Sequence, residues 1–507
     1  MRALGWPGLL VIGAYLAGVL ALGFRFARRQ TSTEEYFMAR RRIPGWAMGI
    51  SLFASIITSI TFIAYPGNAY AGNWAELVSG MMAVVAIALV GLAVVPFFRR
   101  RVRMSAFEFF EQRFGAGLRT YAAVTYAACH CAKMGFVIYL VALTVHSLAG
   151  WPLPGVIGAV GLATVAYTWA GGMAAVIWVD VAQACILAVG IAISLGFLAG
   201  QTPGGAAAGL RLAWHARKFS LGLLTWDPAA KSVWAMAAYG IFWYLQRYTT
   251  DQMIVQRYLV ARSDRDAVRG VALGALLCVP VWALFLLIGT LTWSYYRLTG
   301  EAVPPGLKAD EMYPHFLLTH VPSALAGVLL AALFSAAMSG LSSDFNSMAA
   351  VGVQDFYGKL RPAATDRDRL AAGRGFVILA GLLCTATALL LARSQEAALP
   401  LYFLATSVLS GGLFGLFCLA YCTRRATSAG AAAGIAACLA FTLWAALTSG
   451  ADRRFDLGPA NFAWNSVLIG AIGQAVVVAV GYPASLIFSG RRPAASPPAG
   501  RPCPPGR

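Results

Sequence analysis

Charged residues are scarce in this sequence of 507 residues. Asp, Glu, Lys and Arg together make up 12% of it, whereas soluble proteins carry roughly a quarter of charged residues. A soluble fold of this length could not cover its surface with so few polar groups, but a protein surrounded by lipid needs no polar cover on its outer face. The low charge and the hydrophobic content of 59% therefore exclude an ordinary soluble domain and predict an integral membrane protein.

Motifs for catalysis and for metal binding are also lacking. The sequence contains no Walker loop, no HExxH, no GxSxG in a strand–turn–helix context and no dinucleotide-binding fingerprint. Its nine cysteines form no CxxC pair, and Cys129, His130 and Cys131 would not share one face of a helix. We therefore expect no enzyme, no ATP-driven pump and no organic cofactor, and we interpret the Cys-His-Cys triplet as ordinary helix residues.

An excess of basic residues gives the chain a formal net charge of +19. Such an excess can indicate nucleic-acid binding, but here the basic residues lie in short loops between apolar runs, where membrane topology explains them. With the N-terminus outside, roughly 27 basic residues fall in inside loops and roughly 10 in outside loops, and the opposite orientation reverses this ratio. We predict a protein of the cell (inner) membrane with an external N-terminus, a cytoplasmic C-terminus and no nucleic-acid partner.

Long apolar runs recur along the whole chain. A spanning helix needs about 20 apolar residues, and about thirteen runs reach that length. We predict an all-α membrane protein with one transmembrane domain over residues 1–490, and a disordered, Pro-rich cytoplasmic tail over 491–507. The predicted spans cover residues 7–25, 46–70, 75–97, 119–149, 155–171, 174–200, 233–256, 270–296, 322–351, 373–393, 400–421, 427–449 and 464–489.

The 46–70 span carries an unusual number of hydroxyl groups. Pro66-Gly67 interrupts it, because proline removes a backbone donor and clashes with the preceding turn. Thr58 and Thr61 are three residues apart, so a helix would place them on one face. The interruption is either a simple kink or, as in many transporters, a place where freed backbone groups bind an ion or a solute.

Asp180, Lys133 and Asp344 are charged residues inside predicted spans, where burial is costly and a functional role is the default hypothesis. Asp180 is either linked to a cation or lies at the interface with access to water. Lys133 pairs with a carboxylate of the protein, extends to the membrane surface, or binds an anionic solute. Asp344 lies near the inner half of the 322–351 span and either has a functional role or simply reaches the cytoplasmic water.

More polar residues lie near the end of the 233–256 span. Arg247 and Asp251 are four residues apart, so a helix would bring them together as an ion pair. The following Gln256-Arg257-Tyr258 is expected to lead out to the inside loop.

Five segments together resemble the sodium/solute symporter family, which includes carriers of sugars, proline, iodide, monocarboxylates and sialic acids. The segments cover residues 35–46, 51–67, 171–180, 250–257 and 338–347, and the resemblance extends over about residues 5–490. It implies a LeuT-like core of two five-helix repeats with inverted topology, over about 46–200 and 233–421. The 46–70 and 233–256 helices would be the discontinuous ones.

The resemblance also implies two sodium sites. The site shared by the family lies between the repeats and combines backbone carbonyls with hydroxyls, and its matching residues here are Ala54, Ile57, Ala336, Ser339 and Gly340. The glycine departs from the family, which usually has a second hydroxyl there. A second sodium site found in some relatives matches Asp180, Ser342 and Ser343, and we expect it to carry or share the coupling.

For the solute, the resemblance points to the branch that transports sialic acids. There a basic residue on the fourth span holds the substrate carboxylate, and Lys133 matches it in place of the usual arginine. Lysine lacks the bidentate fork of arginine, so its grip would be looser. Thr58 and Thr61 would offer hydroxyls nearby. We predict Na⁺-coupled symport of a small, anionic organic solute, such as a sialic acid or a monocarboxylate, by alternating access and with no obligate protein partner.

Two other functions are open at this point. Gly340 and the extra carboxylates favour a proton-coupled or uncoupled carrier of a sugar or an amino acid, which replacing Na⁺ by choline in an uptake assay would distinguish. The other is a membrane sensor of solutes. Such sensors carry a soluble output domain, and this sequence ends in a short Pro-rich segment.

Overall fold

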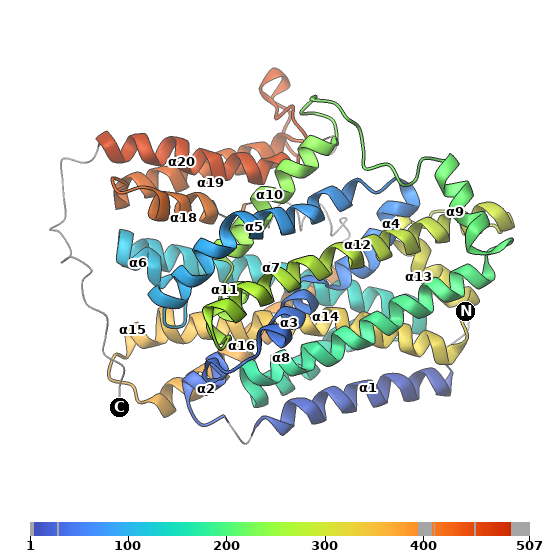
Figure 1. Cartoon of the computed structure of the whole chain (residues 1–507), viewed down its shortest axis with the longest axis horizontal. Coiled ribbons are helices and arrows are strands. Elements are labelled where there is room, and N and C mark those ends of the chain that lie inside the picture. Colours follow the sequence, from blue (N-terminus) through green and yellow to red (C-terminus); the bar gives the residue numbers. More distant parts are fainter. Residues whose placement is uncertain (1–4, 28–29, 394–407, 410, 451–452, 488–507) are drawn as a thin grey trace.

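Helices that run roughly along the long axis of the molecule build the computed structural model (Figure 1). It describes residues 5–27, 30–393, 408–409, 411–450 and 453–487. The regular elements among these residues are all helices, and β-structure is limited to isolated bridges. The predicted all-α fold is therefore confirmed. The main helices are α1 (Trp6–Arg25), α2 (Thr33–Met38), α3 (Gly45–Ile56), α4 (Ser59–Ala71), α5 (Ala75–Arg101), α6 (Glu108–Phe114), α7 (Ala116–Ala149), α8 (Leu153–Gln201), α9 (Gly205–His215), α10 (Val233–Thr250), α11 (Gln252–Val260), α12 (Asp264–Thr299), α13 (Ala309–His320), α14 (Ser323–Val351), the π-helical η3 (Gly352–Tyr357), α15 (Gly358–Leu360), α16 (Asp366–Arg393), α18 (Leu413–Cys422), α19 (Ser428–Thr448) and α20 (Leu468–Ile487).

Among the described residues, nine helices are long and apolar enough to cross a membrane, and α3 and α4 add a span that is bent by 58°. Every predicted span before residue 394 and after residue 426 matches a helix, half of a helix or a helix pair. The predicted 400–421 span is described only at its end, in α18, and the predicted tail over 491–507 lies outside the described residues.

Helix α8 contains two of the predicted spans. Its 49 residues divide at Gly172, whose φ of 57° and ψ of −160° interrupt the helix between the predicted 155–171 and 174–200 spans. A Cβ atom at this position would lie 2.6 Å from the carbonyl oxygen of Tyr36. The hydroxyl of Tyr36 donates to the carbonyl oxygens of Thr168 and Trp169, so α2 packs into the interruption. Glycine is required here by both the positive φ and the close approach.

The break in the 46–70 span does not lie at Pro66-Gly67, and this prediction was wrong. The chain leaves the helical conformation at Ile57 and Thr58, and α4 continues through Pro66. A helix can accommodate a proline in a membrane when neighbouring elements replace the lost interactions. Here α12 crosses so closely that a Cβ atom at Gly289 would lie 2.0 Å from the Pro66 carbonyl oxygen.

The predicted discontinuity of the 233–256 span is present, between α10 and α11. Asp251 lies at the junction in an extended conformation, with φ −83° and ψ 111°. Its Oδ1 atom accepts a hydrogen bond of 3.0 Å from the amide of Met253, which caps the N-terminus of α11.

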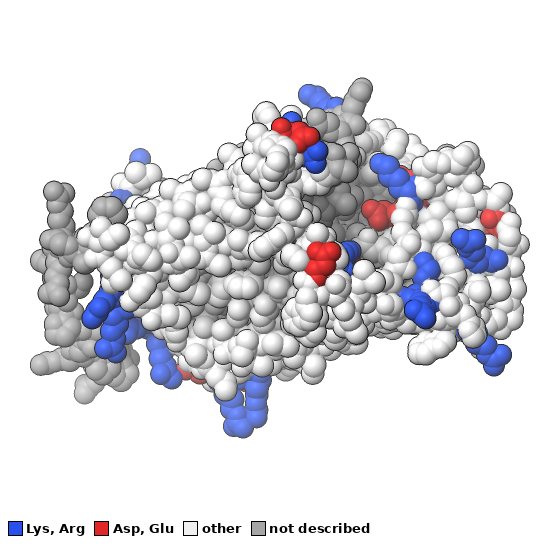
Figure 2. Space-filling view, turned by 90° about the horizontal axis from the view of Figure 1, so that it is seen from above, with Lys and Arg blue, Asp and Glu red and all other residues white. Residues whose placement is uncertain are grey.

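Helix α14 lies at the centre of the bundle and contacts α1, α3, α7, α8 and α16. In its most apolar stretch 78% of the residues are buried, against 28% for α1 and for α16. On the face that Figure 2 shows, a broad region between the two ends of the bundle has few Lys, Arg, Asp or Glu side chains. Lipid is the solvent that such a surface requires.

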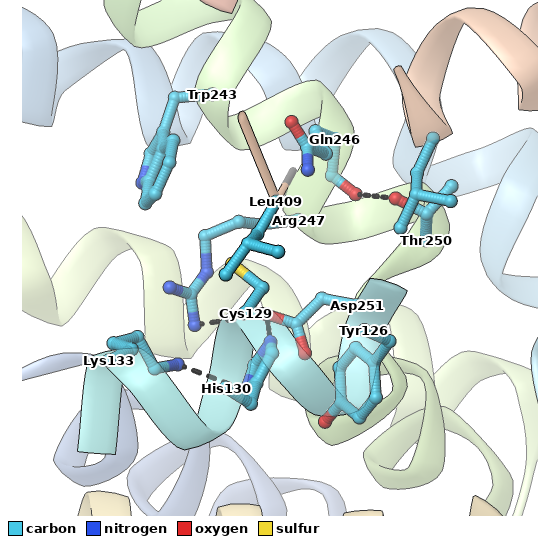
Figure 3. A pocket seen from close by; sticks show the side chains of 11 residues that line it. Tyr126, Cys129, His130, Lys133, Trp243, Gln246, Arg247, Thr250, Asp251 and Leu409 are labelled. Atoms are coloured by element: carbon cyan, nitrogen blue, oxygen red, sulfur yellow. Dashed lines mark hydrogen bonds and ion pairs between the residues drawn. The ribbon is translucent and has the colours of Figure 1, made fainter. Parts of the chain in front are cut away.

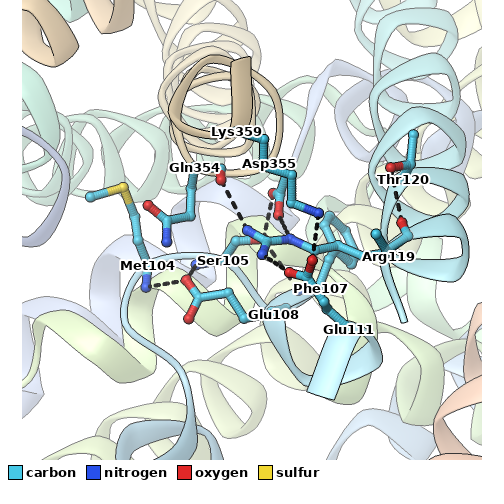
Figure 4. Close-up of polar contacts among 12 residues, drawn as sticks. Met104, Ser105, Phe107, Glu108, Glu111, Arg119, Thr120, Gln354, Asp355 and Lys359 are labelled. Carbon is cyan, nitrogen blue, oxygen red and sulfur yellow. Dashed lines mark hydrogen bonds and ion pairs between the residues drawn. The ribbon is translucent and has the colours of Figure 1, made fainter. Parts of the chain in front are cut away.

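An ionic network connects α6, α7, η3 and α15 at one end of the bundle (Figure 4). Arg119 of α7 pairs with Asp355 of η3 and with Glu111 of α6. Ser105 donates a hydrogen bond of 2.6 Å to Asp355, and Lys359 lies 2.9 Å from Glu111. These contacts therefore fix α7 against η3, which continues directly from α14.

Candidate functional site

The break between α3 and α4 faces the middle of α14. Because the backbone is extended at Ile57 and Thr58, the last carbonyls of α3 lose the amides that would continue the helix, and such freed carbonyls can bind a ligand. A Cβ atom at Gly340 would lie 3.2 Å from Thr58 Cγ2 and 3.7 Å from the Ser55 carbonyl oxygen. The glycine thus lets α14 pass directly against the break.

The five residues predicted for the shared sodium site lie on these two elements. Ala54 lies in the last turn of α3 and Ile57 at the break. The other three, Ala336, Ser339 and Gly340, belong to α14. All five are buried, with Ile57 and Ser339 fully inaccessible. The structure places both halves of the predicted set at the contact between α14 and the break.

Asp180 lies beside this contact and is fully buried, not interfacial. Its Oδ2 atom accepts hydrogen bonds from Ser51 at 2.6 Å and from Ser55 at 3.3 Å, and its Oδ1 atom accepts one from Ser339 at 2.7 Å. The hydroxyls of Ser55 and Ser343 are 2.8 Å apart. One carboxylate from α8 therefore gathers hydroxyls from both α3 and α14.

Arg257 extends into the same cluster. Its guanidinium donates from Nη2 to Ser55 at 2.5 Å and to Ser343 at 2.7 Å, and it lies 3.2 Å from Asp180 Oδ2. The side chain is fully buried, so the expectation that this residue leads out to a loop was wrong. The turn at Asp251 redirects α11 into the bundle and buries the residue.

Two serines are predicted to join Asp180 at a second sodium site. Ser343 is hydrogen-bonded within the cluster, to Ser55 and to Arg257. The hydroxyl of Ser342 donates instead to the Ser339 carbonyl oxygen at 3.2 Å. The position that the prediction assigns to a sodium ion is next to a guanidinium.

A second polar cluster surrounds Lys133 on α7 (Figure 3). Its Nζ atom lies 3.0 Å from Asp344 Oδ2 and 3.2 Å from His130 Nδ1. Asp344 is fully buried, so of its two interpretations the one in which it simply reaches the cytoplasmic water is wrong. The predicted Arg247–Asp251 pair is present at 3.3 Å. A pocket lies beside this cluster. It is lined by His130, Lys133, Arg247 and Asp251, together with Tyr126, Cys129, Trp243, Gln246, Thr250, Leu409 and Leu413.

The two threonines predicted for solute binding lie at the start of α4. Thr58 precedes α4, and Thr61 lies within its first turn and is 5% exposed. Neither lines the pocket around Lys133. The structure brings Thr58 to Gly340 rather than to Lys133.

The sequence matches the sodium:solute symporter family over residues 36–437. The chain belongs to the sodium:solute symporter family. It is 30% identical to the sodium/sialic acid symporter NanT of Aliivibrio fischeri, over 96% of this chain and 94% of that protein. It is 30% identical to the sodium/sialic acid symporter SiaT of Proteus mirabilis, over 89% of this chain and 91% of that protein.

Solved structures give the same result for this symporter. It matches a Na⁺-coupled sialic acid symporter in a substrate-bound, outward-open state with a TM-score of 0.88 and 28% identity, over 96% of this chain and 98% of that chain. Mhp1, a nucleobase-cation-symport-1 family transporter, has the same fold, with a TM-score of 0.54 and 14% identity. The predicted LeuT-like fold is thus confirmed, and the protein is a sodium-coupled secondary transporter, not an enzyme.

Sequence reasoning missed the partners of the predicted site residues in this symporter. It did not foresee that Arg257 turns toward Asp180, although the apolar Tyr258-Leu259-Val260 after it indicates that the chain stays buried. It also gave no role to His130, which lies 2.9 Å from Asp344.

Proposed function

We propose that this sodium symporter carries a small organic anion and binds its carboxylate at Lys133. One observation carries the proposal: the ammonium of Lys133 lies at a pocket between α7 and α10, deep in the bundle, with its side chain only 11% exposed. A buried cation at membrane depth requires an anionic partner. Asp344 is that partner in this structure, and a solute carboxylate would take its place.

The sialic acid symporters among the relatives support an acidic solute, because their names describe transport of a sugar acid. Trp243 and Gln246 line the same pocket and would offer an apolar face and an amide to the rest of the solute. A sialic acid or a monocarboxylate meets this chemistry.

We place one Na⁺ at the α3–α4 break, where the carbonyls of Ala54, Ile57 and Ala336 and the hydroxyl of Ser339 would supply oxygens. Hard cations prefer oxygen ligands of this kind. A second Na⁺ would bind at Asp180, Ser342 and Ser343 once the guanidinium of Arg257 withdraws. Ser339 links the two sites, because its hydroxyl donates to Asp180.

Transport follows from alternating access around these sites. Sodium at the break would bridge α3 and α14 and so fix one relation between the two repeats, which we place at about 46–200 and 233–421 of a single domain over 1–490. The ion gradient and the membrane potential then drive accumulation, since one charge that crosses 100 mV gains about 2.3 kcal/mol. Thr58 and Thr61 would contact the solute in a state in which α4 and α7 lie differently.

Uptake into proteoliposomes tests the proposal. Radiolabelled sialic acid, pyruvate, glucose and proline are offered with an inward Na⁺ gradient, and choline replaces Na⁺ in the control. We expect Na⁺-dependent uptake of a carboxylate, at least tenfold weaker binding of it in Lys133→Gln, and unchanged binding in the matched variant Lys308→Gln on the exposed α12–α13 loop. Uptake of an uncharged sugar that acids do not inhibit would contradict the proposal.

A further inference from the structure

His130 lies between two carboxylates in the pocket around Lys133. Its Nδ1 atom is 2.9 Å from Asp344 Oδ1 on α14, and its Nε2 atom is 3.7 Å from Asp251 Oδ2 at the α10–α11 junction. The imidazole is 7% exposed, Asp251 is 6% exposed and Asp344 is inaccessible. The ring of Tyr126 covers it, with ring centroids 4.0 Å apart. Three elements therefore meet at one histidine, and Figure 3 shows its contact with Asp251.

The hydrogen-bonding chemistry allows this imidazole two arrangements. A neutral imidazole has one donor and one acceptor, whereas an ionised carboxylate only accepts. Unprotonated, His130 can accept from Lys133 at Nδ1, where the two nitrogens are 3.2 Å apart, and direct its single N–H toward Asp251. Protonated, it donates from Nδ1 to Asp344 and lies 3.7 Å from Asp251 as an ion pair, so Asp344 no longer depends on Lys133 for a cationic partner.

The charges around the imidazole balance only without a solute. Among the described residues, the charged and titratable groups around it are Tyr126, Cys129 and Lys133 of α7, Arg247 of α10, Asp251 at the junction and Asp344 of α14. Arg257 of α11 also interacts with the two carboxylates, but its charge is balanced by Asp180. In the cluster itself, Lys133 and Arg247 are the cations, and Asp251 and Asp344 are the carboxylates. The cluster is therefore neutral with a neutral histidine. A solute carboxylate would add a third negative charge, and an uncompensated charge in a buried site is strongly unfavourable.

We propose that His130 is a proton-binding site coupled to the solute site, so that a proton enters with each solute carboxylate. The inference rests on the proposed binding of a carboxylate at Lys133. The proton comes from water on the side from which the solute enters and binds the imidazole, which restores the charge balance and holds Asp344 while Lys133 turns to the solute. Proton and solute then leave together on the other side, so H⁺ moves in addition to Na⁺. Linkage requires that the solute and the proton strengthen each other's binding equally.

Proteoliposomes that enclose a pH-sensitive dye test this coupling. With an inward Na⁺ gradient and no membrane potential, addition of the transported carboxylate to the wild-type protein should acidify the lumen in step with uptake. Solute affinity should fall as the pH rises, by up to tenfold per pH unit, because one proton is bound with the solute. His146→Gln, at the far end of α7, is the matched control and should acidify the lumen like the wild type.

Variants separate a proton site from a merely structural histidine. His130→Gln cannot take up a proton, so it should bind the carboxylate at least tenfold more weakly at pH 6 and lose the pH dependence. Adding Asp344→Asn removes the negative charge that the proton would have neutralised. The double variant should therefore recover most of the affinity, remain independent of pH and move no protons, a rescue that lost packing would not give.

The outcomes distinguish this inference from the proposed function. Na⁺-driven carboxylate uptake without acidification, or a pH profile that His130→Gln leaves unchanged, overturns the proton site alone. Absence of carboxylate uptake by the wild type overturns both. If His130→Gln does not fold, calorimetry of the wild type in buffers of different ionisation enthalpy decides, because binding of the carboxylate must then take up about one proton per solute.

Discussion

Gly340 is the residue at which this chain departs from its family's sodium site, and its surroundings explain what the departure does. A side chain here would touch the methyl group of Thr58 at 3.2 Å, so the glycine brings α14 closer to the break than a serine would. The cost is one fewer oxygen for a cation. The other ligands that we propose are three carbonyls and the hydroxyl of Ser339, which also donates to Asp180.

Gly340→Ser should strengthen sodium binding. The new hydroxyl would add an oxygen ligand, and the Thr58 methyl group needs to move by only a few tenths of an ångström to admit the Cβ atom. We expect the Na⁺ concentration for half-maximal uptake to fall severalfold. Gly340→Ala is the matched control, because it places the same Cβ atom without the oxygen. If serine and alanine gave the same Na⁺ dependence, this position would not contribute to a sodium site.

Sequence could locate Asp180 and Lys133 because a charge in an apolar run stands out whatever the fold. Their partners could not be located in the same way. Asp344 and Lys133 are more than 200 residues apart, and only the packing of α14 against α7 brings them to 3.0 Å. The tight contact of Arg257 with Asp180 likewise depends on the direction that α11 takes after Asp251.

At the scale of elements, the buried pair between Arg257 and Asp180 connects α11 to α8, and the serines around it extend the connection to α3 and α14. All of these groups lie in the interior, where each charge depends on the other. Removing one partner of such a pair typically costs about 3–5 kcal/mol, whereas removing both costs far less.

Asp180→Asn should therefore lower the thermal stability of the purified protein, and Asp180→Asn combined with Arg257→Gln should recover most of it. Both variants should also lose the second Na⁺, so the cooperativity of uptake with respect to Na⁺ should fall toward one ion per solute. Melting in detergent and Na⁺-dependent uptake measure the two effects. Arg265→Gln on an exposed turn of α12 is the control. An unchanged Na⁺:solute ratio in the double variant would exclude a second sodium site at Asp180.

The breaks in the helices were harder to predict than the helices themselves. Apolar length determines where a span lies, because each span must cross the same bilayer thickness. A break depends on what packs against it. The helix α4 continues through Pro66, which α12 covers. The helix is interrupted instead at Ile57 and Thr58, although neither residue is a proline or a glycine. Nothing in the sequence distinguishes Gly172 from the other glycines among the 53, because the residue that packs against it, Tyr36, is distant in the sequence.

For the whole molecule, α14 connects the two polar clusters. Ser339 and Ser343 of this helix face the Asp180 cluster, and Asp344 faces Lys133 and His130 on α7. Because one continuous helix holds both sets of residues, a shift of α14 in response to cations at Asp180 would also move Asp344 beside Lys133. Sodium and solute can thus affect each other without direct contact.

We propose that the end of the bundle that carries α6 and α15 is cytoplasmic, because the last turn of α5, which leads into α6, holds Arg99, Arg100 and Arg101. We call it the basic end. Cysteines introduced at exposed positions test this orientation: Ala363→Cys before α16 at the basic end and Ala302→Cys between α12 and α13 at the other end. A membrane-impermeant maleimide added to intact cells should label only Ala302→Cys above the background of the parent protein, which has exposed Cys185 and Cys422. Opening the cells should make Ala363→Cys reactive. Labelling of Ala363→Cys in intact cells would reverse the orientation and with it the side from which sodium enters.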